Sequence, residues 1–180
     1  FALENCLNDS QEIDIKSLFS KLNDIHLEFR PNHQVLELYL NGKNINKEIR
    51  ELRVSNNVSI VAKQPEIRDF LLDFQRNLAT KGGVIMDGRD IGTVILPNAD
   101  FKFFVTASPV ERARRRHLQL QNAGTEVSYE EVFQNLITRD KIDSERDVAP
   151  LKKADDAILI DNTLLNKEET IALILSHISK

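Results

Sequence analysis

Residues 84–93 have the sequence Val84-Ile85-Met86-Asp87-Gly88-Arg89-Asp90-Ile91-Gly92-Thr93. An apolar run leads into a cation that stands between two carboxylates, with a glycine on either side. A buried strand that ends in this way is typical of a sheet edge that holds a phosphate-bearing ligand, because the planar fork of arginine binds phosphate oxygens in pairs. We therefore expect a strand at residues 84–86 and the chemistry of the protein at residues 87–93.

Charge and cysteine content limit the kind of protein this is. The 180 residues include 24 Lys and Arg and 28 Asp and Glu, for a formal net charge of −4. This balance provides no overall attraction to nucleic acid or to an anionic membrane, so we expect neither as a partner. Cys6 is the only cysteine, which excludes an internal disulfide and a cysteine-based zinc site. We expect a cytoplasmic monomer.

Strands that alternate with helices from residue 65 onward predict an α/β protein with a parallel sheet covered on both faces. Helices are expected at residues 14–23, 65–80, 109–122 and 128–139 and from 167 onward. Strands are expected at residues 26–30, 34–40, 84–86, 101–105 and 157–160. The first two strands, joined by a turn at residues 31–33, form an antiparallel hairpin outside the parallel sheet. Residues 45–53 have mixed character.

Two helices have well-marked beginnings. Ser108 is expected to cap the first, with Pro109 at its first position and Glu111 at its third. Ser128 and Glu131 repeat this capping-box pattern before the second. In a capping box the serine side chain accepts a hydrogen bond from the third residue's amide, and the glutamate accepts one from the serine amide. Both helices are therefore expected to begin directly after their serine.

Arginines gather near the ends of the predicted elements, and together they suit a polyphosphate ligand. They are Arg89, the run Arg112, Arg114, Arg115 and Arg116, and the pair Arg139 and Arg146. Each charge-assisted bond to a phosphate contributes about 1.5–3 kcal/mol. The alternatives are a solvated helix face for the run, weak surface ion pairs for residues 139–146, and turn-capping carboxylates at residues 87–90. The four histidines show no zinc spacing, and no G-x-S-x-G serine elbow occurs.

Three linked motifs carry a resemblance to a known family. They are residues 84–94, residues 108–116, and residues 139–150 followed by 153–157. In this order they closely resemble the bacterial cytidylate kinases (CMP kinases), and the similarity covers essentially the whole chain. The resemblance implies a P-loop-type nucleoside monophosphate kinase fold that transfers the ATP γ-phosphoryl group to CMP or dCMP, with Mg²⁺ accompanying ATP. It also implies an α/β core at residues 1–25 and 69–180, a lid around 112–146, and a monophosphate-binding insert at 26–68.

Roles follow from the resemblance, residue by residue. Ser59, Arg68 and Asp90 match the positions that recognise cytosine and its neighbouring groups, and Arg89 matches a contact to the CMP phosphate. The ribose-side contacts correspond to Arg139 and Asp143, and a further nucleotide contact corresponds to Arg146. Arg89, Arg139 and Arg146 are thus the expected catalytic residues, and Arg115 and Arg116 belong to the ATP side. No residue is expected to bind metal directly.

One part of the family pattern does not occur in residues 1–180, namely the phosphate loop G-x-x-x-x-G-K-[ST]. We expect the chain to begin about one βα unit late and residues 1–180 alone to be inactive. Either a longer native protein supplies the loop, or the chain is a catalytically silent pyrimidine-nucleotide-binding homologue. A third hypothesis, RNA binding by the run at residues 112–116, is weak because no aromatic residues alternate with the arginines.

Overall fold

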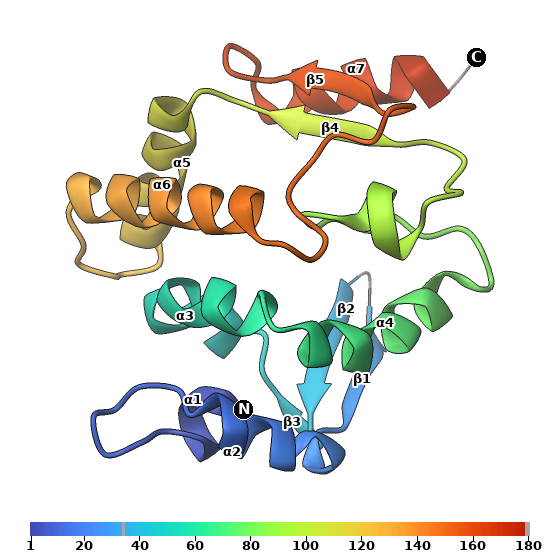
Figure 1. Cartoon of the computed structure of the whole chain (residues 1–180). Coiled ribbons are helices and arrows are strands. Elements are labelled where there is room, and N and C mark those ends of the chain that lie inside the picture. The colour runs from blue at the N-terminus through green and yellow to red at the C-terminus, as the bar shows by residue number, and fades with distance from the viewer. Residues whose placement is uncertain (34, 179–180) are drawn as a thin grey trace. The chain divides into compact units, whose positions relative to one another are not determined.

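The computed structural model describes residues 1–33 and 35–178 of the chain. The chain forms two compact units, Phe1–Asp73 and Phe74–Lys180 (Figure 1). The prediction of an α/β protein with a parallel sheet and a small antiparallel sheet is confirmed. None of the helices in the described part of the chain has the length and apolar character that crossing a membrane demands.

The first unit begins with short helices packed around a small core. The helices are α1 (Ala2–Asn5), α2 (Ile15–Ser20) and the 3₁₀ turn η1 (Leu22–Asp24). Asp14 caps α2 by accepting a hydrogen bond from the Ser17 amide at 3.0 Å. Cys6, Leu18 and Ile67 are all at most 7% exposed and form one apolar cluster, so this helical corner is held by burial.

A three-stranded antiparallel sheet follows, with the order β1 (Leu27–Asn32), β2 (Val35–Leu40) and β3 (Lys43–Asn44). The prediction that residues 31–33 form the turn was wrong in part, because Pro31 and Asn32 are paired residues of β1. Proline is tolerated there because β1 is an edge strand, whose outward amides have no partner to lose. Asn41 and Gly42 connect β2 to β3 with φ of 49° and 80°, values typical of a type I′ turn.

Two longer helices complete this part of the chain. After the 3₁₀ turn η2 (Glu48–Arg50) come α3 (Leu52–Ala62), which the sequence did not predict, and α4 (Pro65–Ala79), which it did. Proline at the first position and Glu66 in the first turn favour the start of α4, since proline has no amide to leave unpaired and the acid faces the positive end of the helix dipole.

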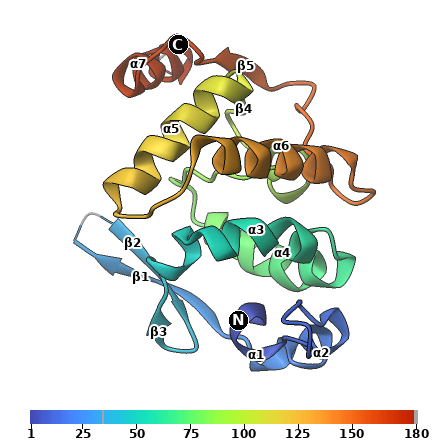
Figure 2. The ribbon, with the colours of Figure 1, turned by 90° about the vertical axis from the view of Figure 1, so that its left-hand side faces the viewer.

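The second unit contains the predicted parallel sheet and the helices that pack beside it. Its strands are β4 (Phe103–Thr106) and β5 (Ile158–Asp161), and its helices are α5 (Pro109–Asn122), α6 (Tyr129–Glu145) and α7 (Lys167–Ile178). β4 and β5 lie side by side in parallel, and α7 packs on them with the His177 ring 6.3 Å from that of Phe103 (Figure 1). α5 and α6 pack against each other beside this sheet (Figure 2). α6 reaches Glu145 rather than ending at Arg139, so Arg139 lies within a helix.

The strand predicted at residues 84–86 is absent from the described structure. Residues 84–86 have no ladder hydrogen bonds, and Ile85 is fully exposed. An apolar run becomes a strand only when a neighbour pairs with its amides and carbonyls, and no described strand does so here. The apolar run at 94–96 is likewise not extended, because Ile91–Ile95 form a single π-helical turn, η3.

Candidate functional site

The η3 turn fixes the backbone on which Arg89 and Asp90 lie. The Asp90 carbonyl accepts hydrogen bonds from the amides of residues 93–95, at 3.3, 2.9 and 3.3 Å. From α4, Arg76 donates through Nε to the Ile95 carbonyl at 3.2 Å and through Nη2 to the Val94 carbonyl at 3.1 Å. The turn therefore holds Asp90, which is 8% exposed, in one position.

Helix α6 presents the other half of the site. Ser128 and Glu131 form the predicted capping box at its start, with both reciprocal hydrogen bonds present. Arg139, Asp143 and Arg146 follow at spacings of four and three residues, which places them on one helix face. Arg146 is the C-cap residue, and its Nε donates to the Ala149 carbonyl at 2.7 Å. The helix end is thereby fixed to the loop that follows it.

These two halves meet in a charged cluster. Arg89 Nε lies 3.3 Å from Asp143 Oδ2, and Arg146 Nη1 lies 3.7 Å from Asp143 Oδ1. Arg146 Nη2 lies 3.6 Å from Asp90 Oδ1. The side chains of Arg146 and Asp143 are 4% and 5% exposed, whereas that of Arg89 is 43% exposed. The cluster thus has a buried base and one arginine that is accessible from solvent.

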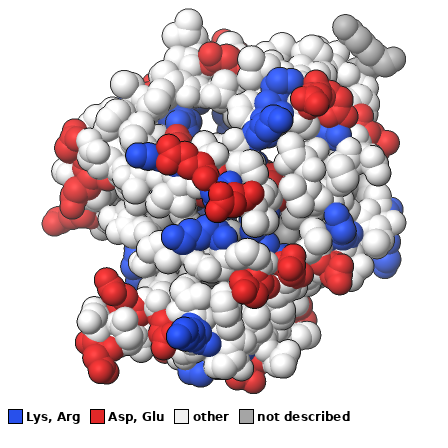
Figure 3. Space-filling model, in the orientation of Figure 1, with Lys and Arg blue, Asp and Glu red and all other residues white. Residues whose placement is uncertain are grey.

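The cluster carries more positive than negative charge. It contains the three cations Arg89, Arg139 and Arg146 and the two carboxylates Asp90 and Asp143, while Asp140, which also attracts Arg139, is paired with Arg112. Burial lowers the pKa of Arg139, and the neighbouring charge of Arg89 lowers this pKa further. An arriving anion would relieve this repulsion. Over the face in Figure 3, acidic and basic side chains are otherwise interspersed, so anion binding depends on such local groups.

The arginine run on α5 is engaged with the protein. Arg112 forms a bidentate ion pair with Asp140, and this pair links α5 to α6. Arg115 donates to Glu111 and to the loop after β5, and Arg116 Nη1 donates to Gln119 Oε1 at 2.7 Å. The interpretation of this run as a purely solvated face does not describe Arg112 and Arg115, whose guanidinium groups make tertiary contacts.

The remaining two predicted site residues lie in the first unit. Ser59, on α3, is 4% exposed, and Arg68, on α4, donates through Nη1 to the Ala62 carbonyl at 3.4 Å. The structure therefore brings together five of the predicted acceptor-side residues, namely Arg89, Asp90, Arg139, Asp143 and Arg146, in one cluster of the second unit. Ser59 and Arg68 are near each other in the sequence at the junction of α3 and α4.

Sequence reasoning missed Arg76, although its two bonds to the η3 carbonyls support the site. A basic residue in the last turn of a helix is ordinary, because it interacts favourably with the dipole of its own helix. Its partners are 18 and 19 residues away in the sequence. Nothing in the local pattern distinguishes such an arginine.

Comparison with known proteins agrees with this geometry. A family model described as cytidylate kinase matches residues 1–180, the whole chain. The chain belongs to the cytidylate kinase family. The cytidylate kinase of Flavobacterium johnsoniae is 46% identical over 99% of this chain and 79% of its own length. The cytidylate kinase of Carboxydothermus hydrogenoformans is 44% identical over 99% of this chain and 79% of its own length.

A cytidylate kinase from Bacillus cereus is also 44% identical, over 94% of this chain and 76% of its own length. Cytidylate kinases are transferases that act on nucleotides, so this chain belongs to an enzyme family. Among the described residues of this family member, no group of three or more His, Cys, Asp or Glu side chains is arranged to hold a metal ion.

Proposed function

We propose that this chain carries the acceptor side of a phosphotransferase that moves the ATP γ-phosphoryl group to CMP or dCMP, giving CDP or dCDP and ADP. The observation that carries the proposal is the cluster of three arginines on two buried carboxylates, in a member of the cytidylate kinase family. Phosphoryl transfer depends on positioning and charge neutralisation more than on covalent chemistry. A site rich in fixed arginines and without an activated nucleophile fits that requirement.

Each member of the cluster has a distinct task in this proposal. Arg89, with 43% of its side chain exposed, binds the CMP phosphate by exchanging part of its contact to Asp143 for phosphate oxygens. Arg139 and Arg146 neutralise the charge that develops as the phosphoryl group moves. Asp143 orients Arg89 and Arg146 and takes part in the ribose-side contacts. These three arginines are the catalytic residues we assign.

Recognition of the base is assigned to Ser59, Arg68 and Asp90. A hydroxyl and a carboxylate accept hydrogen bonds from the exocyclic amine of cytosine, whereas the carbonyl of uracil offers them no donor. In the domain division that we propose, residues 26–68 form the monophosphate-binding insert. Residues 1–25 and 69–180 form the core, and the region 112–146 acts as the lid.

The donor is ATP with Mg²⁺. Magnesium is usually held by phosphate oxygens, waters and one or two carboxylates, so the absence of a larger acidic cluster among the described residues is compatible with an ion that arrives with ATP. The ion neutralises phosphate charge when bound. Arg115 and Arg116 lie on the donor side in this proposal. The protein is proposed to act as a cytoplasmic monomer on small-molecule substrates.

A coupled assay tests the activity. The protein that carries residues 1–180, together with whatever sequence precedes Phe1 in its gene, is incubated with ATP, Mg²⁺ and CMP, dCMP or UMP, and ADP release is followed. We expect ADP formation with CMP and dCMP and much less with UMP. A lack of ADP formation with CMP would refute the proposal.

A catalytically silent pyrimidine-nucleotide-binding homologue is the second candidate, because the cluster of arginines could bind CMP whether or not a phosphoryl group is transferred. Calorimetric binding of CMP by the same protein, without ADP formation in the coupled assay, would favour this candidate over the kinase.

A further inference from the structure

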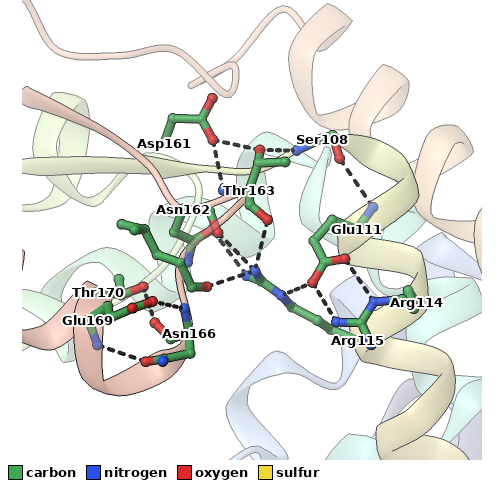
Figure 4. Close-up of polar contacts among 11 residues, drawn as sticks. Ser108, Glu111, Arg114, Arg115, Asp161, Asn162, Thr163, Asn166, Glu169 and Thr170 are labelled. Carbon is green, nitrogen blue, oxygen red and sulfur yellow. Dashed lines mark hydrogen bonds and ion pairs between the residues drawn. The ribbon is translucent and has the colours of Figure 1, made fainter.

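The loop between β5 and α7 lies where an open α/β sheet binds its ligands. β4 and β5 are parallel, and their carboxyl ends lead into α5 and into residues 162–166 (Figure 4). Ligands of such sheets bind outside the carboxyl ends of the strands. A surface cavity of about 310 Å³ lies at this loop and is lined by Arg115, Asn162, Leu165, Asn166 and Thr170, among others. The conformation of residues 162–166 therefore affects the binding of any ligand at the carboxyl ends of β4 and β5.

Arg115 connects helix α5 to this loop through both terminal nitrogens of its guanidinium group, while its Nε is held by a residue of α5 itself. Nε donates to Glu111 Oε1 at 2.7 Å, and Nη1 donates to Asn162 Oδ1 at 3.2 Å. Nη2 donates to the carbonyls of Asn162 at 2.8 Å and Leu165 at 3.0 Å. Only an arginine offers this planar fork of five donors, and lysine does not replace it. Figure 4 shows the side chain aimed at the loop from α5.

The beginning of α5 supports the same connection. The sequence predicted a full capping box, but the Glu111 side chain does not bond to the Ser108 amide and instead holds Arg114 and Arg115. The Ser108 amide donates to Thr163 Oγ1 at 2.9 Å, and this hydroxyl in turn donates to Asp161 Oδ1 at 2.6 Å. A loop residue has therefore taken the place of Glu111 in the cap.

We propose that Arg115 is a positioning residue that holds residues 162–165 in the conformation required by the donor nucleotide, without binding that nucleotide itself. The proposal rests on the proposed kinase function for its donor, and on the contacts above for the positioning. Nε, Nη1 and Nη2 all donate to protein oxygens, so the guanidinium group is fixed by the same hydrogen bonds that shape the loop, and these bonds would compete with a direct contact to ATP. In this proposal Arg115 acts on the donor side indirectly, by fixing the conformation of residues 162–165.

The chain offers a matched control at the neighbouring position. Arg114 bonds to the same carboxylate, with Nε 2.8 Å from Glu111 Oε2 and Nη2 2.7 Å from Oε1, but its guanidinium group makes no hydrogen bond to residues 162–166. Its side chain is 61% exposed. Arg115→Met and Arg114→Met thus remove the same charge from the same helix and the same glutamate, and only the first releases residues 162–165.

The experiment combines kinetics with amide hydrogen exchange on the protein as encoded, with any sequence upstream of Phe1. We expect Arg115→Met to raise KM for ATP about tenfold, since a small misplacement of a binding segment is enough for such a loss. KM for CMP and kcat should stay within about twofold. Exchange at the amides of Leu165 and Asn166 should become about tenfold faster as the loop opens locally. Arg115→Lys should resemble Arg115→Met, and Arg114→Met should resemble the wild type in all these quantities.

Two results would overturn the proposal. One is an ATP defect in Arg115→Met without faster exchange at residues 163–166, which would show direct contact with ATP. The other is equal behaviour of the Arg115→Met and Arg114→Met variants. If Arg115→Met does not fold, Arg115→Lys provides the same comparison. Absence of kinase activity in the wild type would refute the proposed function, whereas the exchange comparison would still decide whether Arg115 positions the loop.

Discussion

Arg146→Met is expected to destabilise the second unit strongly, because it removes a buried cation from between two buried carboxylates. Arg146 Nη2 lies 3.6 Å from Asp90 Oδ1, and its side chain is 4% exposed. Methionine fills much of the same space but leaves the Asp90 charge without this partner. Breaking a buried ion pair costs about 3–5 kcal/mol. Since Arg89 still faces Asp143, we expect the lower value, about 3 kcal/mol.

Urea unfolding followed by circular dichroism measures this loss, and a thermal scan should show a fall in Tm of about 6–12 °C for a chain of this length. Arg114→Met is the control, because it removes an exposed arginine from the same unit. The double variant Asp90→Asn/Arg146→Met should be more stable than Arg146→Met alone by about 1 kcal/mol, because it no longer buries the uncompensated carboxylate.

A loss of less than about 1 kcal/mol, which is the size of an exposed ion pair, would refute the reasoning that burial makes this contact strong. If the double variant is as unstable as Arg146→Met, the unpaired Asp90 carboxylate is not what destabilises the single variant.

Three further predictions concern single side chains. Arg89→Ala should raise KM for CMP about tenfold or more in the coupled assay, because we propose that this half-exposed arginine binds the phosphate. The urea midpoint should stay nearly unchanged, because Asp143 keeps Arg146 as a partner; wild-type KM would contradict the proposed role. Ser59→Ala should lower the ratio of kcat/KM for CMP over UMP, and an unchanged ratio would remove this serine from base recognition. Hydrogen bonds from Arg114 and Arg115 lower the pKa of Glu111 to about 2, so its stabilising effect is complete above the unfolded pKa near 4.3 and is lost as the pH falls toward 2. The stability difference between wild type and Glu111→Gln should therefore be constant above about pH 5 and shrink in acid, and a difference that instead grew in acid would contradict the assigned pairing.

Helices with local start signals could be predicted from the sequence. Ser128 and Glu131 encode the start of α6 within four residues, and Pro65 with Glu66 does the same for α4. The cluster of five acceptor-side residues was also expected, since each stands in a motif that resembles cytidylate kinases. That these five lie together is an observation of the structure, whereas their roles in binding and catalysis stay predictions.

Features that depend on distant partners could not be predicted. The apolar run at residues 84–86 satisfies every local criterion for a strand, yet a strand forms only with a paired neighbour. Helix α3 has no side-chain cap, and its β-branched and Ser/Asn-rich sequence has low helix propensity, so tertiary packing decides its conformation. Arg115 has its partners 47 to 50 residues away, and only the fold reveals that its guanidinium group is engaged.

The hydrogen bond from the Ser108 amide to Thr163 Oγ1 joins residues that are 55 positions apart. The N-terminus of α5 is therefore complete only after the segment that follows β5 has docked. Closing so long a stretch of chain costs entropy before any contact compensates for it, so this end of α5 should form late in folding although its own residues favour a helix. During unfolding, detachment of β5 and α7 would break this hydrogen bond and fray the first turn of α5. The second unit should consequently unfold cooperatively, with no intermediate that has released only its C-terminal strand and helix.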